Sequence, residues 1–128
     1  MNVILDTHTF IWLDGDASRL SAKAVQYLTD PASRIFLSVA SIWEMVVKVG
    51  SGKLTLRTDV RTLVAEQTTR NPIQLLPILA EHAYELGALP PIHKDPFDRM
   101  LVSQAIVENA ILLTVDPMIR KYPVRTDW

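Results

Sequence analysis

The stretch Met1-Asn-Val-Ile-Leu-Asp-Thr-His-Thr9 decides how the rest of the chain is interpreted. Residues 3–5 form an uninterrupted apolar run, which is typical of a strand buried on both faces of a parallel sheet. The run stops abruptly at Asp6, and a helical pattern follows over residues 7–13. Ligands bind at the carboxyl ends of strands in open α/β sheets, so Asp6 stands where a site is expected.

Further short apolar runs alternate with helical patterns along the chain. We expect further strands at 35–37, 73–78 and 111–115, with a last edge strand from about Val124. We expect helices at 7–13, 22–29, 38–49, 59–69, 79–86 and 96–109, and one or two helical turns at 117–122. This alternation predicts an α/β fold with a mainly parallel sheet. The helix at 38–49 is apolar on most sides, so we expect it to be largely buried.

The composition favours a single domain over residues 1–128 and excludes several classes of site. The chain has 48% hydrophobic and 21% charged residues and no cysteine, which excludes a disulfide framework and a thiolate metal site. Its formal net charge of −1 means that a polyanion must be held by a local basic patch or a bound cation. The apolar runs are too short to span a bilayer, and the N-terminal run reads as a strand rather than a signal peptide. We expect a cytoplasmic protein without a membrane partner.

Four carboxylates are expected to converge at the carboxyl edge of the sheet. Asp6 and Asp116 each follow a buried strand, Asp98 lies in the first turn of a helix, and Glu44 lies on the helix after the second strand. Carboxylates at close range raise one another's pKa unless they are compensated, and a divalent cation supplies that compensation. An all-oxygen site favours Mg²⁺ or Mn²⁺ over Zn²⁺.

Each acid also has a structural interpretation. Asp6 is a candidate N-cap of the helix that follows it, and Asp116 precedes a proline, as N-cap residues often do. A carboxylate at Asp98 would favour the dipole of its helix, whereas Asp95, directly before Pro96, is the better N-cap candidate. We assign the site role to Asp98 and the cap to Asp95.

Glu44 and Thr114 each allow two interpretations. Glu44 completes the capping-box pattern that begins at Ser41, and Lys48 lies one turn further for an ion pair. Alternatively, Glu44 faces a polar cleft. Thr114 is expected on the same side of its strand as Asp116, where it would order the carboxylate or a water, or would be an ordinary strand residue.

The remaining polar residues give weaker signals. The histidines lack the spacing of metal ligands and are interpreted as surface or packing residues: His8, His82 and His93. Four cations are candidates for a basic rim near the acids or for an ordinary solvated surface: Arg99, Arg120, Lys121 and Arg125.

The ordered set of motifs resembles a known family. The motifs are Ile4-Leu5-Asp6-Thr7, Ser41-Ile42-Trp43-Glu44 with Lys48, Gly52-Lys53-Leu54, Asp95-Pro96-Phe97-Asp98-Arg99-Met100-Leu101 and Leu113-Thr114-Val115-Asp116. Together they resemble the PIN-domain ribonucleases, and more narrowly the VapC-type toxins of bacterial type II toxin–antitoxin systems. The resemblance implies a three-layer α/β/α sandwich with a mainly parallel sheet of about five strands. It also implies an acidic quartet of Asp6, Glu44, Asp98 and Asp116, with Asp6 and Asp98 as the principal Mg²⁺ ligands.

The resemblance further implies an activity and its partners. The expected reaction is Mg²⁺-dependent hydrolysis of RNA phosphodiester bonds, with Mn²⁺ as a substitute ion and with 5′-phosphate and 3′-hydroxyl products. The expected assembly is a homodimer that is neutralised by a VapB-type antitoxin, and operator DNA is bound only through that antitoxin.

Three other functions compete with this interpretation. A PIN-like module that binds RNA or protein without cutting would be favoured by the loss of one acid, and none of the four is missing. A haloacid-type phosphatase requires a second aspartate two residues after the strand-end aspartate, but His8 stands there. A receiver domain requires an acidic pair beside its first strand and a lysine after a late strand, whereas Asn2 and Asp116-Pro117 occupy those places.

Overall fold

Five parallel strands form the centre of the computed structural model, which describes residues 1–128. The strands lie in the order β3-β2-β1-β4-β5, so the first strand in sequence is the middle one. Its residues Val3, Ile4 and Leu5 are fully buried, as predicted for a strand covered on both faces. The strands are β1 (Asn2–Leu5), β2 (Arg34–Ser38), β3 (Ile73–Leu76), β4 (Ile111–Leu113) and β5 (Thr126–Asp127).

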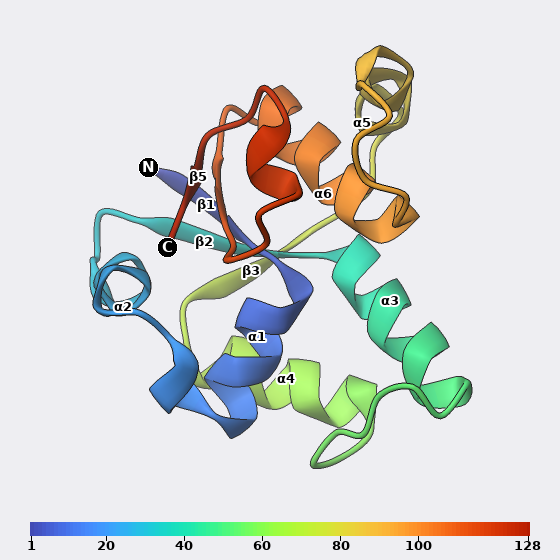
Figure 1. The fold of residues 1–128 in the computed structure, drawn as a ribbon. Coiled ribbons are helices and arrows are strands. Elements are labelled where there is room, and N and C mark those ends of the chain that lie inside the picture. Colours follow the sequence, from blue (N-terminus) through green and yellow to red (C-terminus); the bar gives the residue numbers. More distant parts are fainter.

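Helices cover both faces of this sheet and give the predicted three layers (Figure 1). The helices are α1 (Thr7–Gly15), α2 (Ala22–Thr29), α3 (Val39–Gly50), α4 (Val60–Arg70), α5 (Ala80–Glu85) and α6 (Pro96–Val107). Short 3₁₀ turns lie at η1 (Ala17–Arg19), η2 (Leu86–Ala88) and η3 (Ile119–Lys121). The three-layer α/β/α sandwich predicted from the resemblance is confirmed.

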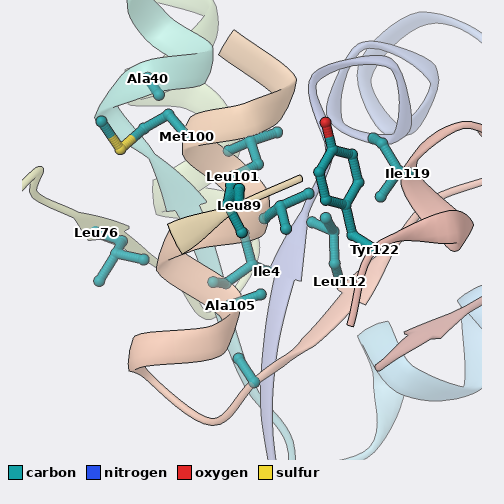
Figure 2. Packing of buried hydrophobic residues seen from close by; sticks show 12 residues of the cluster. Ile4, Ala40, Leu76, Leu89, Met100, Leu101, Ala105, Leu112, Ile119 and Tyr122 are labelled. Atoms are coloured by element: carbon teal, nitrogen blue, oxygen red, sulfur yellow. The ribbon is translucent and has the colours of Figure 1, made fainter. Parts of the chain in front are cut away.

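Successive residues of β1 contribute to two separate cores, because side chains alternate between the faces of a strand. Val3 and Leu5 pack in a cluster with residues of α1, α2 and α4. Ile4 packs on the opposite face with residues of α6 and with Tyr122 (Figure 2). The sheet is therefore held from both sides, which fixes the height at which each strand ends.

Parallel pairing aligns the ends of β1 and β4. Leu5 is the register partner of Leu113, so Asp6 and Thr114 leave the sheet side by side. β4 is shorter than predicted, since the backbone N–H of Asp116 donates to the Thr114 hydroxyl at 3.0 Å instead of to a neighbouring strand. Asp116 therefore lies in the loop after the strand rather than at its end.

The expectation that α3 is largely buried was wrong. Only the residues that face α1, α4 and α6 are covered, because the helix extends beyond the carboxyl edge of the sheet (Figure 1). Trp43 and Val46 are 54% and 53% exposed. The Trp43 ring nevertheless packs edge-on against Phe97 of α6, with ring centroids 4.9 Å apart.

None of the helices combines the length and apolarity that crossing a bilayer requires.

Candidate active site

Asp6 caps α1 and also lines the acidic pocket, so its position is compatible with both interpretations of this residue. Its side chain caps α1, because Oδ1 accepts a hydrogen bond from the backbone N–H of Thr9 at 2.7 Å. Its other oxygen, Oδ2, accepts from the hydroxyl of Thr114 at 2.5 Å. The carboxylate is almost fully buried and still lines a pocket. Two donors from different segments thus fix the direction in which this carboxylate faces.

Glu44 reaches the same region from α3. Its Oε1 accepts from the Thr7 hydroxyl at 2.6 Å, and its Oε2 pairs with the ammonium of Lys48 one turn along the helix. The N-cap of α3 is Ser38, so the capping box that begins at Ser41 does not form. The structure therefore contains the predicted ion pair with Lys48, and Glu44 also faces the polar cleft that was the alternative interpretation. A carboxylate that is only 2% exposed is stabilised by these donors.

Lys48 lines the pocket beside the acids. Burial by itself lowers its pKa, but the hydrogen bond to Glu44 and the charges of Glu44, Asp95 and Asp98 raise that pKa above its usual value. Lys48 therefore stays protonated and supplies one positive charge against a larger number of carboxylates.

Asp98 lies in the first turn of α6 and is the most perturbed acid of the pocket. Asp95 is the N-cap of this helix, as predicted, and its Oδ1 accepts from the backbone N–H of Asp98 at 3.2 Å. Burial, together with the charges of Asp95 and Glu44, raises the pKa of Asp98 to about 7. Above about pH 7, then, this group takes on a charge that its surroundings do not fully compensate.

Asp116 faces the pocket from the loop after β4. Its Oδ1 accepts from the backbone N–H of Met118 at 2.8 Å and so caps the following turn. Its own backbone N–H donates to Thr114, whose hydroxyl donates to Asp6. A single threonine hydroxyl therefore links the two acids that follow β1 and β4, which supports the ordering role considered for this residue.

His93 is the site residue that the sequence interpretation missed. Its Nε2 lies 3.2 Å from Oδ2 of Asp98 and 3.2 Å from Oδ2 of Asp116. It is neither a surface nor a packing residue, in contrast to the interpretation from spacing. Its one sequence signal is its position two residues before Asp95, in the loop that leads into α6. The other two histidines fit the earlier interpretation, since His8 is exposed and His82 is buried in the packing between α5 and α6.

A pocket of about 280 Å³ collects all four predicted acids from four different segments. Its lining residues are Asp6, His8, Trp12, Glu44, Lys48, Asp95, Asp98, Val115 and Asp116. None of the four cations considered for a basic rim lines this pocket. Arg99 binds the Pro90 carbonyl, and Arg125 binds Asn109, which precedes β4 at the opposite edge of the sheet.

A comparison with known families identifies the family of this chain. Residues 3–124 match the family model described as PIN domain. The chain belongs to the PIN domain family. No protein of curated function matches its sequence.

Solved structures share the PIN domain fold of this chain at low sequence identity. VapBC2 from Rickettsia felis, bound to a DNA fragment from its promoter, matches with a TM-score of 0.75 and 18% identity over 99% of this chain and 98% of that one. DNA-bound VapBC from Salmonella typhimurium matches with a TM-score of 0.70 and 15% identity over 99% and 97% of the two chains. VapBC-1 from nontypeable Haemophilus influenzae matches with a TM-score of 0.66 and 20% identity over 99% and 97%.

The donor set of this PIN domain fits a divalent cation that prefers oxygen ligands. Carboxylate oxygens of Asp6, Glu44, Asp98 and Asp116 line one small pocket. The pKa of Asp98 is raised first by burial and further by the charges of Asp95 and Glu44, an excess of negative charge that Lys48 alone does not offset. A cation among these oxygens would relieve that excess, and its charge would allow a phosphate to approach.

Proposed function

We propose that this PIN domain is a Mg²⁺-dependent endoribonuclease. The observation that carries the proposal is the convergence of four carboxylates in one pocket, where the pKa of Asp98 is raised to about 7. A strongly perturbed acid in a cleft is a candidate for a functional site. Membership of the PIN domain family and the resemblance of the ordered motifs to VapC-type ribonucleases support hydrolysis of RNA phosphodiester bonds.

Some residues of the site would bind the cation, and others keep the carboxylates in position. Asp6 and Asp98 would bind Mg²⁺, or Mn²⁺ in its place, with Glu44 and Asp116 binding directly or through water. When bound, such a cation lowers the pKa of a coordinated water and stabilises negative charge developing on the phosphate. Thr114 keeps the Asp6 carboxylate in place through its hydroxyl.

A second hollow next to the acidic pocket offers a path for the RNA backbone. This hollow of about 270 Å³ shares His8, Glu44 and Lys48 with the acidic pocket and adds Lys53 to the lining. Lysine side chains bind phosphates without regard to base sequence. The exposed Lys53 side chain thus offers a contact for a phosphate beside the one that is cut.

The test is cleavage of labelled single-stranded RNA by the purified protein in Mg²⁺, in Mn²⁺ and in EDTA. We expect cutting that requires the cation and is lost in Asp98→Asn. Glu81→Gln is the matched control, since Glu81 is an exposed acid in the first turn of α5. RNA that is bound but left intact in both ions would contradict the enzyme proposal and favour a non-catalytic binding module. Cutting that persists in EDTA would contradict the metal requirement.

We further propose that the enzyme is the toxin of a type II toxin–antitoxin system. The three matched structures are of VapBC complexes, and two of them contain DNA. The surface between α3 and α4 has an apolar hollow of about 540 Å³, lined in part by Ile42, Val46, Val60 and Leu75. Exposed apolar side chains on this scale favour contact with a protein.

The expected assembly is a cytoplasmic homodimer that binds a VapB-type antitoxin, with operator DNA bound only through the antitoxin. The formal net charge of −1 supports this indirect mode of DNA binding. Sedimentation of the protein alone and with the product of an adjacent small gene tests the assembly. The proposed assembly would be contradicted if the protein stays monomeric and if the added gene product neither binds it nor inhibits its nuclease activity.

A further inference from the structure

The ring of His93 contacts a different partner at each of its two nitrogens. Nε2 lies 3.2 Å from one oxygen of Asp98 and 3.2 Å from one oxygen of Asp116. Nδ1 accepts a hydrogen bond from the backbone N–H of Asp95 at 3.1 Å. The three donor atoms of His93, Asp98 and Asp116 lie within 4.8 Å of one another, as in a metal site.

The partner of Nδ1 decides which role Nε2 can take. A backbone N–H only donates, so Nδ1 presents a lone pair to Asp95 and the proton of the neutral ring sits on Nε2. Nε2 therefore donates to Asp116, lies 3.2 Å from an oxygen of Asp98, and has no lone pair for a metal. Histidines that bind metals show the opposite pattern, since their second nitrogen donates to an acceptor.

The ring is held in this place by its surroundings. The backbone N–H of His93 donates to the Tyr122 hydroxyl at 2.7 Å, and the same hydroxyl accepts from Arg99 at 3.1 Å. Tyr122 is itself buried in the core between the sheet and α6 (Figure 2). The loop before α6 is thereby anchored at the same residue whose ring faces the acids.

We propose that His93 is a positioning residue of the acidic site: its Nε2–H binds Asp116 and lies against Asp98, and so keeps the two carboxylates side by side without binding the metal. Two carboxylates this close repel each other, and the N–H dipole placed beside both offsets part of the repulsion. The contact uses Oδ2 of each carboxylate, which leaves Oδ1 of Asp98 for a cation. The inference rests on the proposed metal site, and it concerns how this chain arranges its ligands.

The first test reads the protonated nitrogen of His93 directly, without RNA. Long-range ¹H–¹⁵N correlation spectra of the chelated protein at pH 8 should show the proton on Nε2. The same pattern should persist when Mg²⁺ is added, because His93 remains a donor. A proton on Nδ1 in either state would overturn the proposal, since Nε2 would then be free to bind the metal.

The second test separates the two nitrogens with a pair of variants. His93→Gln places an amide N–H near the position of Nε2, whereas His93→Asn keeps an amide oxygen near that of Nδ1 and is too short to place a donor near that of Nε2. The readout is Mn²⁺ affinity, measured from the electron paramagnetic resonance of free Mn²⁺, and Mg²⁺ affinity by competition. We expect His93→Asn to weaken both affinities about 10- to 100-fold and His93→Gln to restore most of the loss. Circular dichroism of both variants checks that they fold.

The outcomes distinguish this proposal from the nuclease proposal. The positioning role alone is contradicted if the wild type binds the metal and His93→Asn binds it equally well. It is also contradicted if His93→Gln fails to restore the affinity that His93→Asn loses. If both variants lose far more affinity for Mn²⁺ than for Mg²⁺, His93 would be a nitrogen ligand of the metal. That result would also overturn the positioning role. A wild-type protein that binds neither ion would contradict the proposed metal site, and the role of His93 with it.

Discussion

Asp98→Asn is expected to stabilise the metal-free protein at pH 8 and to have little effect at acid pH. The pKa of Asp98 is raised from 3.8 to about 7, mainly by burial and by neighbouring acids. Between these two values the folded protein holds one more proton than the unfolded chain does. Raising the pH through that window therefore favours unfolding, with the full cost present above pH 7.

The size of the effect follows from the width of the window. About three pH units at 1.36 kcal/mol each give an upper limit of about 4 kcal/mol. The Asp98 side chain is 18% exposed, so solvent relaxes part of this cost. Asparagine keeps an oxygen for the N–H of His93 but loses a favourable charge at the start of α6, which costs roughly 0.5 kcal/mol. We therefore expect a net stabilisation of about 2–3 kcal/mol at pH 8.

The assay is urea unfolding in EDTA at pH 5 and pH 8, followed by tryptophan fluorescence. The quantity of interest is the difference in unfolding free energy between variant and wild type, because other groups titrate equally in both. Glu81→Gln also removes a first-turn carboxylate, so it should lower the unfolding free energy by roughly 0.5 kcal/mol or less, and by the same amount at both pH values. An Asp98→Asn protein that is no more stable than wild type at pH 8 would refute the reasoning. Mg²⁺ should then stabilise the wild type at pH 8 much more than the variant.

Two further predictions concern neighbours of the acids. Thr114→Val keeps the shape of the side chain but leaves the Asp6 carboxylate without one donor; we expect a loss of about 1–3 kcal/mol in urea unfolding and weaker Mg²⁺ binding in calorimetry, and unchanged values of both would contradict the ordering role. Lys53→Gln removes an exposed charge from the second hollow; we expect a higher KM for RNA with unchanged kcat and unfolding free energy, and an unchanged KM would exclude a phosphate contact there.

Local chemistry explains why much of the fold was predictable. The apolar run of β1 and the cap at Asp95 each depend on a few adjacent residues, and the structure contains both. The convergence of the acids was also predictable, because parallel strands end at one edge whatever the loops between them do.

The features that sequence reasoning missed depend on contacts between distant segments. His93 reaches Asp116 across 23 residues, and its loop is anchored through Tyr122. The exposed side of α3 depends on how far the helix extends beyond the sheet, which its own periodicity does not encode. In the same way, Lys48 lies in the pocket because it pairs with Glu44, which faces the pocket. Arg125 instead binds Asn109 at the opposite edge of the sheet.

Some of the acids cap backbone segments and others do not, and this difference bears on how PIN domains would lose activity. Asp6 and Asp116 each cap the start of the segment that follows them in the chain. Selection for folding alone would therefore retain both residues after catalysis had ceased. Asp98 caps nothing, and its raised pKa predicts that its charge destabilises the metal-free chain above pH 7, so we expect it to be the first to be replaced in a pseudoenzyme. A surviving aspartate at the end of β1 is therefore poor evidence of nuclease activity in a relative of this chain, whereas an aspartate in the first turn of α6 is good evidence.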